Sequence, residues 1–131
     1  MKAVKEGHVL TAGISHPGEQ RSNNEDYFRF RSYRLEDGTP SVVAVVSDGI
    51  GGHQAGEVAS EITVETVFEV LEQGNGTQPL QEMGRAIQTA GEQVVSTADL
   101  DPAFEGMGAT VSIAWVIGDK LYTATIGDSR I

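Results

Sequence analysis

Two stretches within the first 50 residues show the hydrophobic patterns of β-strands. Residues 41–46 are small or β-branched with almost no polarity, which predicts a strand buried on both faces. In residues 27–35 apolar and polar side chains alternate, as is typical of a strand with one buried face. The turn-forming pair Asp37 and Gly38 separates these stretches, so we expect an antiparallel hairpin over residues 27–48. Residues 8–14 alternate moderately and indicate an earlier strand.

Two longer stretches have the spacing of helices. Apolar side chains recur at helical intervals in residues 53–73, and Gly74 to Gly76 ends this pattern. Pro79 opens a second helix, and Gly84 and Gly91 on its apolar stripe predict a close approach to a neighbouring element. The expected buried positions are Ala55, Val58, Ala59, Ile62, Thr66 and Val70 in the first helix, and Leu80, Met83, Gly84, Ile87, Gly91, Val94 and Val95 in the second.

The last third of the chain returns to strand patterns. Residues 99–108 are expected to form a loop, and residues 109–117 and 121–126 to form strands on either side of the hairpin signal Gly118-Asp119. The order strands, helices, strands predicts an α+β fold in which helices lie on an antiparallel sheet.

Composition narrows the possible functions. The chain has 131 residues, no cysteine, nine Lys and Arg and a net charge of -10. It is long enough for one domain with its own core, and it offers no disulfide framework or thiolate metal site. The acidity argues against a nucleic-acid-binding surface, and it has two interpretations, solubility or carboxylates gathered around cations. No apolar run is long enough for a membrane span, and residues 1–10 lack the apolar core of a signal peptide, so we expect a cytoplasmic protein.

Asp48 is the first candidate for chemistry. It stands at the expected end of the strand over residues 41–46 and is followed by Gly49, Gly51 and Gly52. A carboxylate on a rigid strand, with a glycine carbonyl beside it, suits a hard cation such as Mg²⁺ or Mn²⁺. The alternative is that Asp48 only ends the strand and the glycines only make a turn.

Polar clusters flank the other expected strands. Arg21, Asn24, Glu25 and Asp26 precede the strand over residues 27–35, residues 106–110 precede the strand that follows them, and residues 127–130 follow the last strand. In an antiparallel hairpin the start of one strand lies beside the end of its partner, so Glu25 and Asp26 should lie close to Asp48. Converging carboxylates repel one another unless a cation neutralises them, which favours a metal site.

Four of these motifs occur together in one known family. Arg21-x-x-Asn24-Glu25-Asp26, Asp48-Gly-x-Gly-Gly-His53, Gly108-Ala-Thr110 and Gly127-Asp128-Ser-Arg130 resemble, in order and approximate spacing, the motifs of the metal-dependent Ser/Thr protein phosphatases of the PPM (PP2C-type) family. The resemblance is to the bacterial single-domain members that oppose Ser/Thr kinases. It implies a four-layer α-β-β-α sandwich, in which two antiparallel sheets are flanked by helices.

The resemblance also implies a role for each motif residue. Asp48 would bridge two Mn²⁺ or Mg²⁺ ions, with the Gly49 carbonyl on one of them, Glu25 and Asp26 would hold metal-bound waters, and Asp128 would bind a third, weaker ion. Arg21 would clamp the phosphate through its planar fork of donors, the alternative being a surface arginine paired with Glu25. The residues expected to give structural support are Asn24, Gly51, Gly52, His53 and Thr110.

Two departures from the family pattern bear on activity. Many eukaryotic relatives have His directly after the Asp-Gly pair, where this chain has Ile50. The family domain is roughly twice as long, and its later Asp-Gly and Asp-Asn motifs complete the metal site. We therefore expect residues 1–131 to be a single, truncated N-terminal portion of such a domain, with weak metal binding and impaired or absent activity.

Interactions follow from the same interpretation. Phosphoserine and phosphothreonine proteins would be the substrates, with a cognate Ser/Thr kinase as a further partner and neither nucleic acid nor membrane involved. An unpaired sheet edge at residues 121–126 and uncovered apolar faces around Trp115 would favour self-association. The alternative function is a non-catalytic binding or regulatory module on the same fold. A phosphate-binding Gly-loop NTPase is excluded, because the glycines of residues 49–52 are not followed by the required Lys and Ser or Thr.

Overall fold

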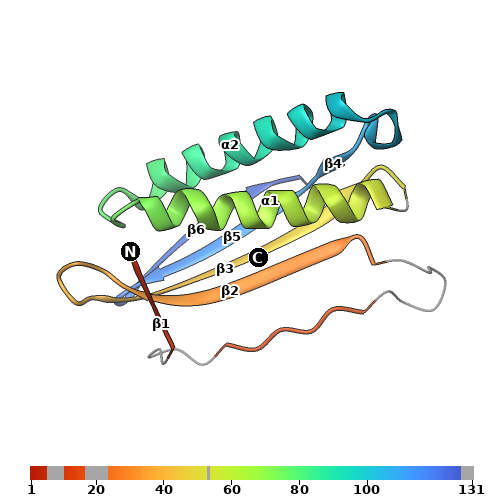
Figure 1. Cartoon of the computed structure of the whole chain (residues 1–131). Helices are drawn as coiled ribbons and strands as arrows, with labels where there is room; N and C mark the ends of the chain where they lie inside the picture. Colours follow the sequence, from red (N-terminus) through yellow and green to blue (C-terminus); the bar gives the residue numbers. More distant parts are fainter. Residues whose placement is uncertain (6–10, 17–23, 53, 128–131) are drawn as a thin grey trace.

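A computed structural model describes residues 1–5, 11–16, 24–52 and 54–127, and it has two layers (Figure 1). One antiparallel sheet, with the strand order β1-β2-β3-β5-β6 and the short β4 paired to β3, carries two helices on one face. The strands are β1 Lys2–Val4, β2 Asp26–Arg34, β3 Pro40–Ile50, β4 Gly108–Ala109, β5 Val111–Ile117 and β6 Lys120–Ile126. The helices are α1 Gln54–Gln73, α2 Pro79–Leu100 and a single 3₁₀ turn at Pro102–Phe104. The α+β prediction is confirmed, and the described residues form one sheet and one helical layer of the expected sandwich.

The hairpin predicted over residues 27–48 is present as β2 and β3. Its turn is closed by a hydrogen bond from the Gly38 amide to the Leu35 carbonyl, and Gly38 has a φ of 86°, in the left-handed region where glycine is favoured. The Asp37 carboxylate accepts a hydrogen bond from the Thr39 amide (2.9 Å). This turn fixes the register, because every residue pair along the two strands follows by counting outwards from it.

The core lies between the sheet and the helices. Val43 and Val45 of β3 and Ile113 and Trp115 of β5 belong to one core cluster with residues of both helices, and all four are at most 1% exposed. The indole N–H of Trp115 donates to the Ser41 hydroxyl (2.7 Å), which satisfies its one polar group. The expectation of an uncovered apolar face around Trp115 was therefore wrong, because the helices cover this side of β5.

Strand β3 differs from its prediction in length and in burial. It continues past Asp48 to Ile50, because Gly49 and Ile50 pair with β4, a contact that local sequence does not reveal. Only its odd-numbered residues face the helices. On the other face Val42 is 6% exposed but Val46 is 49% and Ile50 60% exposed, so the predicted burial on both faces holds at Val42 and is wrong towards the end of the strand.

Helix α2 buries only part of the predicted stripe: Met83 and Val94 are buried as expected, and Ile87 is partly buried. Leu80 and Val95 are 65% and 61% exposed. A Cβ added to Gly84 or Gly91 would meet no atom within 4 Å, so the close approach predicted at these glycines is wrong. The buried side chains of α2 are Glu82, Met83, Ala86, Ala90 and Val94. Small alanines, and not the larger apolar residues near the helix ends, let α2 pack closely.

The N-terminal region also departs from its prediction. Residues 6–10 lie outside the described residues, and residues 11–16 form no strand but pass over Phe28 on the sheet face away from the helices (Figure 1). A strand that the pattern did not indicate, β1, pairs with the end of β2 instead. Helix α2 extends to Leu100, into the region expected to be a loop.

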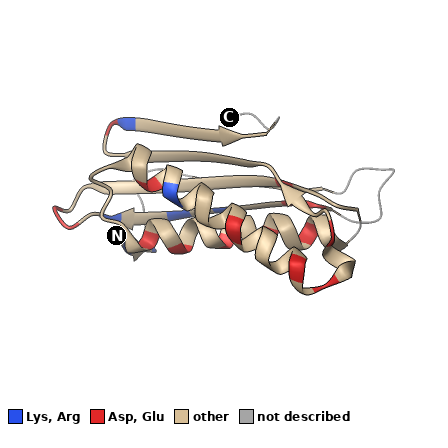
Figure 2. Ribbon diagram, turned by 90° about the horizontal axis from the view of Figure 1, so that it is seen from above, with Lys and Arg blue, Asp and Glu red and all other residues tan. Residues whose placement is uncertain are grey.

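Ion pairs tie β2 to α1. Arg29 pairs with Glu65, and Glu72 accepts from both Arg31 (2.6 Å) and Tyr33 (2.7 Å). Burial favours the neutral form of Glu72, but the hydrogen bonds from Tyr33 and Arg31 outweigh it and hold the pKa of this carboxyl below its ordinary value. Acidic positions extend along both helices (Figure 2), and α1 contains no Lys or Arg. Neither helix combines the length and the apolar character that a membrane span requires, among the residues that the structure describes.

Candidate metal centre

Asp26 and Asp48 are directly opposite each other on neighbouring strands. One step outward, the Gly49 amide donates to the Glu25 carbonyl (3.0 Å), so Glu25 and Gly49 form a hydrogen-bonded pair. Because such pairs alternate with non-hydrogen-bonded ones, Asp26 and Asp48 occupy the narrower type, with Cα atoms about 4.5 Å apart. Both residues are exposed. The predicted convergence of Asp26 on Asp48 is confirmed.

The face of the sheet on which this pair lies follows from alternation along β2. Tyr27 and Arg29 contact Glu65 of α1, so their even-numbered neighbours, Asp26 included, face away from the helices. Two like charges directly opposite each other destabilise a sheet, and a divalent cation would remove that repulsion. Carboxylate oxygens are also the donors that Mg²⁺ and Mn²⁺ prefer. The acidic pair therefore fits a hard cation in charge and in donor type.

Glu25 is held in a different way from Asp26. Its carboxylate lies against Gly56 in the first turn of α1, where a Cβ would come within 2.7 Å of Oε2. Gly56 was not singled out by the sequence, because its contact with Glu25 joins segments distant along the chain. In the described part of the chain, no three His, Cys, Asp or Glu side chains are grouped closely enough to hold a metal ion. The described site is thus a carboxylate pair with Glu25 beside it.

Two of the glycines after Asp48 adopt backbone conformations that other residues rarely adopt. Gly51 and Gly52 have φ values of 141° and 69°, and both lie in the region that favours glycine. Gly49 has a steric role that the sequence did not reveal, because a Cβ there would lie 1.8 Å from the Gly56 carbonyl oxygen. The end of β3 and the start of α1 thus meet backbone to backbone.

Supporting residues surround both aspartates. The side-chain carbonyl of Asn24 accepts from the Asp26 amide (3.0 Å), and its amide group donates to the Ser15 hydroxyl, so Asn24 orders the entry to β2. Thr110 is buried, with 5% of the residue exposed, and its hydroxyl accepts a hydrogen bond from the Asp48 amide (3.0 Å). Each of these two residues thus makes a hydrogen bond to the backbone of one aspartate.

Three of the predicted site residues, Arg21, His53 and Asp128, lie outside the described residues. Ile50, two residues after Asp48, is 60% exposed.

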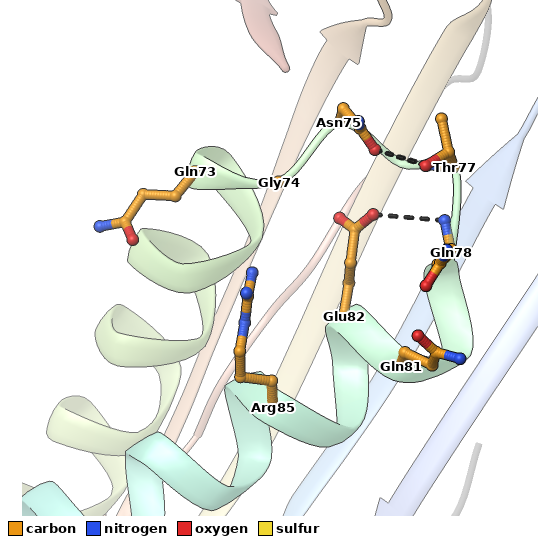
Figure 3. Close-up of a pocket in the computed structure, with 8 residues that line it drawn as sticks. All are labelled: Gln73, Gly74, Asn75, Thr77, Gln78, Gln81, Glu82 and Arg85. Atoms are coloured by element: carbon orange, nitrogen blue, oxygen red, sulfur yellow. Dashed lines mark hydrogen bonds between the residues drawn. The ribbon is translucent and has the colours of Figure 1, made fainter.

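A polar pocket of about 490 Å³ lies at the other end of α1, around the α1–α2 connection (Figure 3). The buried Glu82 carboxylate accepts from the amides of Gly76 (3.2 Å) and Gln78 (3.3 Å), and Arg85 lines the same pocket. Helix α1 has 20 residues, so about 30 Å separates this pocket from the acidic pair. The hydrogen bonds of Glu82 hold the α1–α2 connection in place, and the pocket is separate from the candidate metal centre.

Comparison with known proteins identifies relatives over nearly the whole chain. A family model described as Protein phosphatase 2C matches residues 12–131. The serine/threonine protein phosphatase PstP of Mycobacterium tuberculosis is 31% identical over 119 residues, which are 91% of this chain and 21% of PstP. The protein phosphatase PhpP of Streptococcus pneumoniae is 32% identical over 116 residues, which are 87% of this chain and 46% of PhpP.

Solved structures give the same result for the fold. The serine/threonine phosphatase Stp1 of Staphylococcus aureus matches with a TM-score of 0.77 and 28% identity, over 99% of this chain and 50% of Stp1. The catalytic domain of PstP, in complex with two manganese ions, matches with a TM-score of 0.73 and 30% identity, over 89% of this chain and 47% of that structure. The chain thus spans about half the length of PhpP and of these two structures.

Proposed function

The chain belongs to the protein phosphatase 2C family. We propose that it functions as a metal-dependent protein serine/threonine phosphatase, which hydrolyses phosphomonoesters of Ser and Thr. The observation that carries this proposal is the acidic pair of Asp26 and Asp48, set at opposed positions of β2 and β3. The proposal is also supported by the relatives of the chain, PstP and PhpP, which are protein phosphatases. The solved structure of the PstP catalytic domain contains two manganese ions.

The cofactor we propose is Mn²⁺ or Mg²⁺, with two or three ions in a complete domain. When bound, the ions would lower the pKa of water, so that hydroxide is available at neutral pH to attack phosphorus. Asp48 and Asp26 would supply the negative charge that retains the ions, with the Gly49 carbonyl, Glu25 and Asp128 as further ligands or holders of water. Arg21 would bind the phosphate oxygens through paired, charge-assisted hydrogen bonds.

Calorimetric titration with Mn²⁺ tests the role of Asp48. We expect weak binding by the parent chain and no measurable binding after Asp48→Asn, which keeps the shape of the side chain but removes its charge. Asp119→Asn is the matched control, because Asp119 is an exposed aspartate in the turn between β5 and β6, at the opposite end of the sheet from the acidic pair, and it should bind as the parent does. Equal Mn²⁺ affinity of the Asp48→Asn variant and the parent would show that the site lies elsewhere.

We further propose that the 131-residue chain alone turns over phosphate esters slowly. The support is that two divalent ions require several carboxylates, whereas the described residues bring only Asp26 and Asp48 into a direct pair. A chromogenic aryl phosphate assayed with excess Mn²⁺ should show little turnover. Addition of the separately produced C-terminal half of a PP2C-family relative should raise it. Rapid turnover by the pure chain would contradict this proposal.

The proposed substrates are phosphoserine and phosphothreonine proteins, with a cognate Ser/Thr kinase as a partner. Phosphoprotein substrates are supported by the names of the relatives, which are Ser/Thr protein phosphatases. The kinase and a cytoplasmic location remain predictions from the sequence.

Self-association is proposed through the sheet face away from the helices. Apolar side chains on this face are exposed, among them Phe30 at 38%, Val46 at 49% and Leu121 at 62%. Exposed apolar area of this kind on a folded chain favours burial against a partner. The edge strand β6 adds unpaired backbone groups, with Lys120 as its one charged residue.

The charges on this face support a second copy of the chain as the occupant. Lys2 and Arg34 are paired at one end of the face, and Asp26 and Asp48 are paired at the other. A two-fold axis would place the basic end of each copy over the acidic end of its partner, with the apolar side chains between them.

A further inference from the structure

The hydrogen bonds between β3 and the strand opposite it change pattern at Asp48. Gly49 pairs with Ala109 and Val46 pairs with Ser112, so the same register sets Asp48 opposite Thr110. The Thr110 amide donates to the Asp48 carbonyl (2.8 Å), as in a regular antiparallel ladder. The Asp48 amide, however, donates to the Thr110 side-chain hydroxyl (3.0 Å).

A second hydroxyl completes this arrangement. In a regular ladder the Thr110 carbonyl would pair with the Asp48 amide, but here it accepts from the Ser47 hydroxyl (2.6 Å). Ser47 is fully buried and Thr110 is 5% exposed, so water has little access to either group. Two side-chain hydroxyls thus replace the backbone hydrogen bond that would join the Asp48 amide to the Thr110 carbonyl in a regular sheet. This replacement occurs at Asp48, the candidate metal ligand.

Thr110 also contacts the segment that follows β6. A Cβ on Gly127, whose φ is 104°, would lie 2.7 Å from the Thr110 methyl carbon, so the backbone passes close to this side chain. Thr110 therefore touches both segments that supply candidate ligands, the end of β3 through its hydroxyl and the start of the Gly127 motif through its methyl group.

We propose that Ser47 and Thr110 are positioning residues, whose hydroxyl groups fix the backbone of Asp48 and so aim its carboxylate at the divalent cation. The inference rests on the proposed function, since it assigns a purpose to the bonds around a metal ligand. A ligand held within a fraction of an ångström binds more tightly than one free to rotate, because less ordering remains to be done when the ion arrives. Loss of either hydroxyl would leave a buried polar partner without its bond and allow the strand to shift.

Variants of Thr110 separate positioning from general stability. Thr110→Val keeps the volume and removes the hydroxyl, and we expect it to weaken Mn²⁺ binding by about tenfold or more, as loss of a group that holds a metal ligand in place does. Thr110→Ser keeps the hydroxyl and removes the methyl, and its affinity should stay within about threefold of the parent, a smaller change than the tenfold loss expected for Thr110→Val. Ser47→Ala should weaken binding in the same direction as Thr110→Val. Val67→Ala, a fully buried change in the later part of α1 and distant from both hydroxyls, is the control for a loss of stability without a loss of affinity.

Two measurements decide between the outcomes. Calorimetry gives the Mn²⁺ affinity, and amide hydrogen exchange in the metal-free chain reports on the Asp48 N–H, which should exchange faster in Thr110→Val but at the parental rate in Thr110→Ser. Parental Mn²⁺ affinity in Thr110→Val would overturn the positioning role while leaving the proposed function intact. A parent chain that binds no Mn²⁺ at all would overturn the proposed function, and the assignment of the hydroxyls to a cation with it.

Discussion

The contact between the end of β3 and the start of α1 gives the sharpest test of the fold. A Cβ added to Gly49 would lie 1.8 Å from the Gly56 carbonyl oxygen, 2.4 Å from its carbon and 2.8 Å from its Cα, all of them backbone atoms. Since ordinary contacts of a Cβ begin at about 3.4 Å, Gly49→Ala requires the two backbones to separate by about 1.6 Å. No side-chain rotation can relieve this overlap.

The expected cost follows from the two opposing effects of the added methyl. Overpacking in a closely packed region destabilises by about 1–3 kcal/mol, and more where the backbone must move. Replacement of glycine by alanine also restricts the unfolded chain, which stabilises by about 0.4–1 kcal/mol wherever the native backbone accepts alanine. Gly84→Ala isolates that second effect, because Gly84 lies within α2 with no atom within 4 Å of a Cβ. Alanine there should stabilise the chain by about 0.5–1 kcal/mol.

Urea unfolding of the parent and the two variants measures this difference. The free energies of unfolding, extrapolated to water at a chain concentration at which light scattering detects no association, should place Gly49→Ala about 2–4 kcal/mol below Gly84→Ala. A Gly49→Ala variant within about 0.5 kcal/mol of the parent, the usual range for surface substitutions, would show that α1 does not begin against β3. The orientation of the helical layer would then be wrong at the site.

Two further predictions test the other face of the sheet and the ion pairs. The pKa of Glu72 lies below its ordinary 4.5 in the folded chain, so this carboxylate contributes stability that is present above pH 4.5 and lost as the pH falls through the folded value. The urea midpoints of the parent and Glu72→Gln should therefore differ most at neutral pH and converge in acid, and a constant difference would contradict the assignment. Light scattering after size exclusion at tens of micromolar should show the parent as more than a monomer, Arg34→Glu as more dissociated, and Arg85→Glu, a charge reversal on α2, as unchanged. A monomeric parent that binds no dye specific for exposed apolar surface would refute self-association.

The hairpin of β2 and β3 could be predicted from the sequence because its information is local. Asp37 and Gly38 mark the turn, and counting outwards from the turn sets Asp26 opposite Asp48. The same reasoning found the hairpin at Gly118-Asp119, where Ile117 pairs with Lys120. In each case a few neighbouring residues determine the register of a whole strand pair.

The features that the sequence did not reveal depend on contacts between distant segments. β3 continues to Ile50 because β4, nearly 60 residues later, pairs with it. Gly49 and Gly56 must both be small because one backbone crosses the other, and each glycine by itself suggests only flexibility. On α2, apolar size favoured Leu80 and Val95 as buried positions, whereas close helix packing selects the small Ala86 and Ala90. Pattern gives the elements, and it is the packing of remote surfaces that decides which of their faces is buried.

The acidic pair connects the stability of this fold to its proposed chemistry. Asp26 and Asp48 lie opposite each other in a narrow strand pair, so their repulsion opposes the hairpin that brings them together. The pair is held in place by three features: the turn at Gly38, the hydroxyls of Ser47 and Thr110, and the backbone contact at Gly56. A cation that binds only the folded chain would raise the free energy of unfolding, by about 2.7 kcal/mol at a free concentration one hundred times its Kd. Contacts elsewhere in the sheet thus hold two opposed carboxylates together, and a divalent ion bound between them would lower their mutual repulsion.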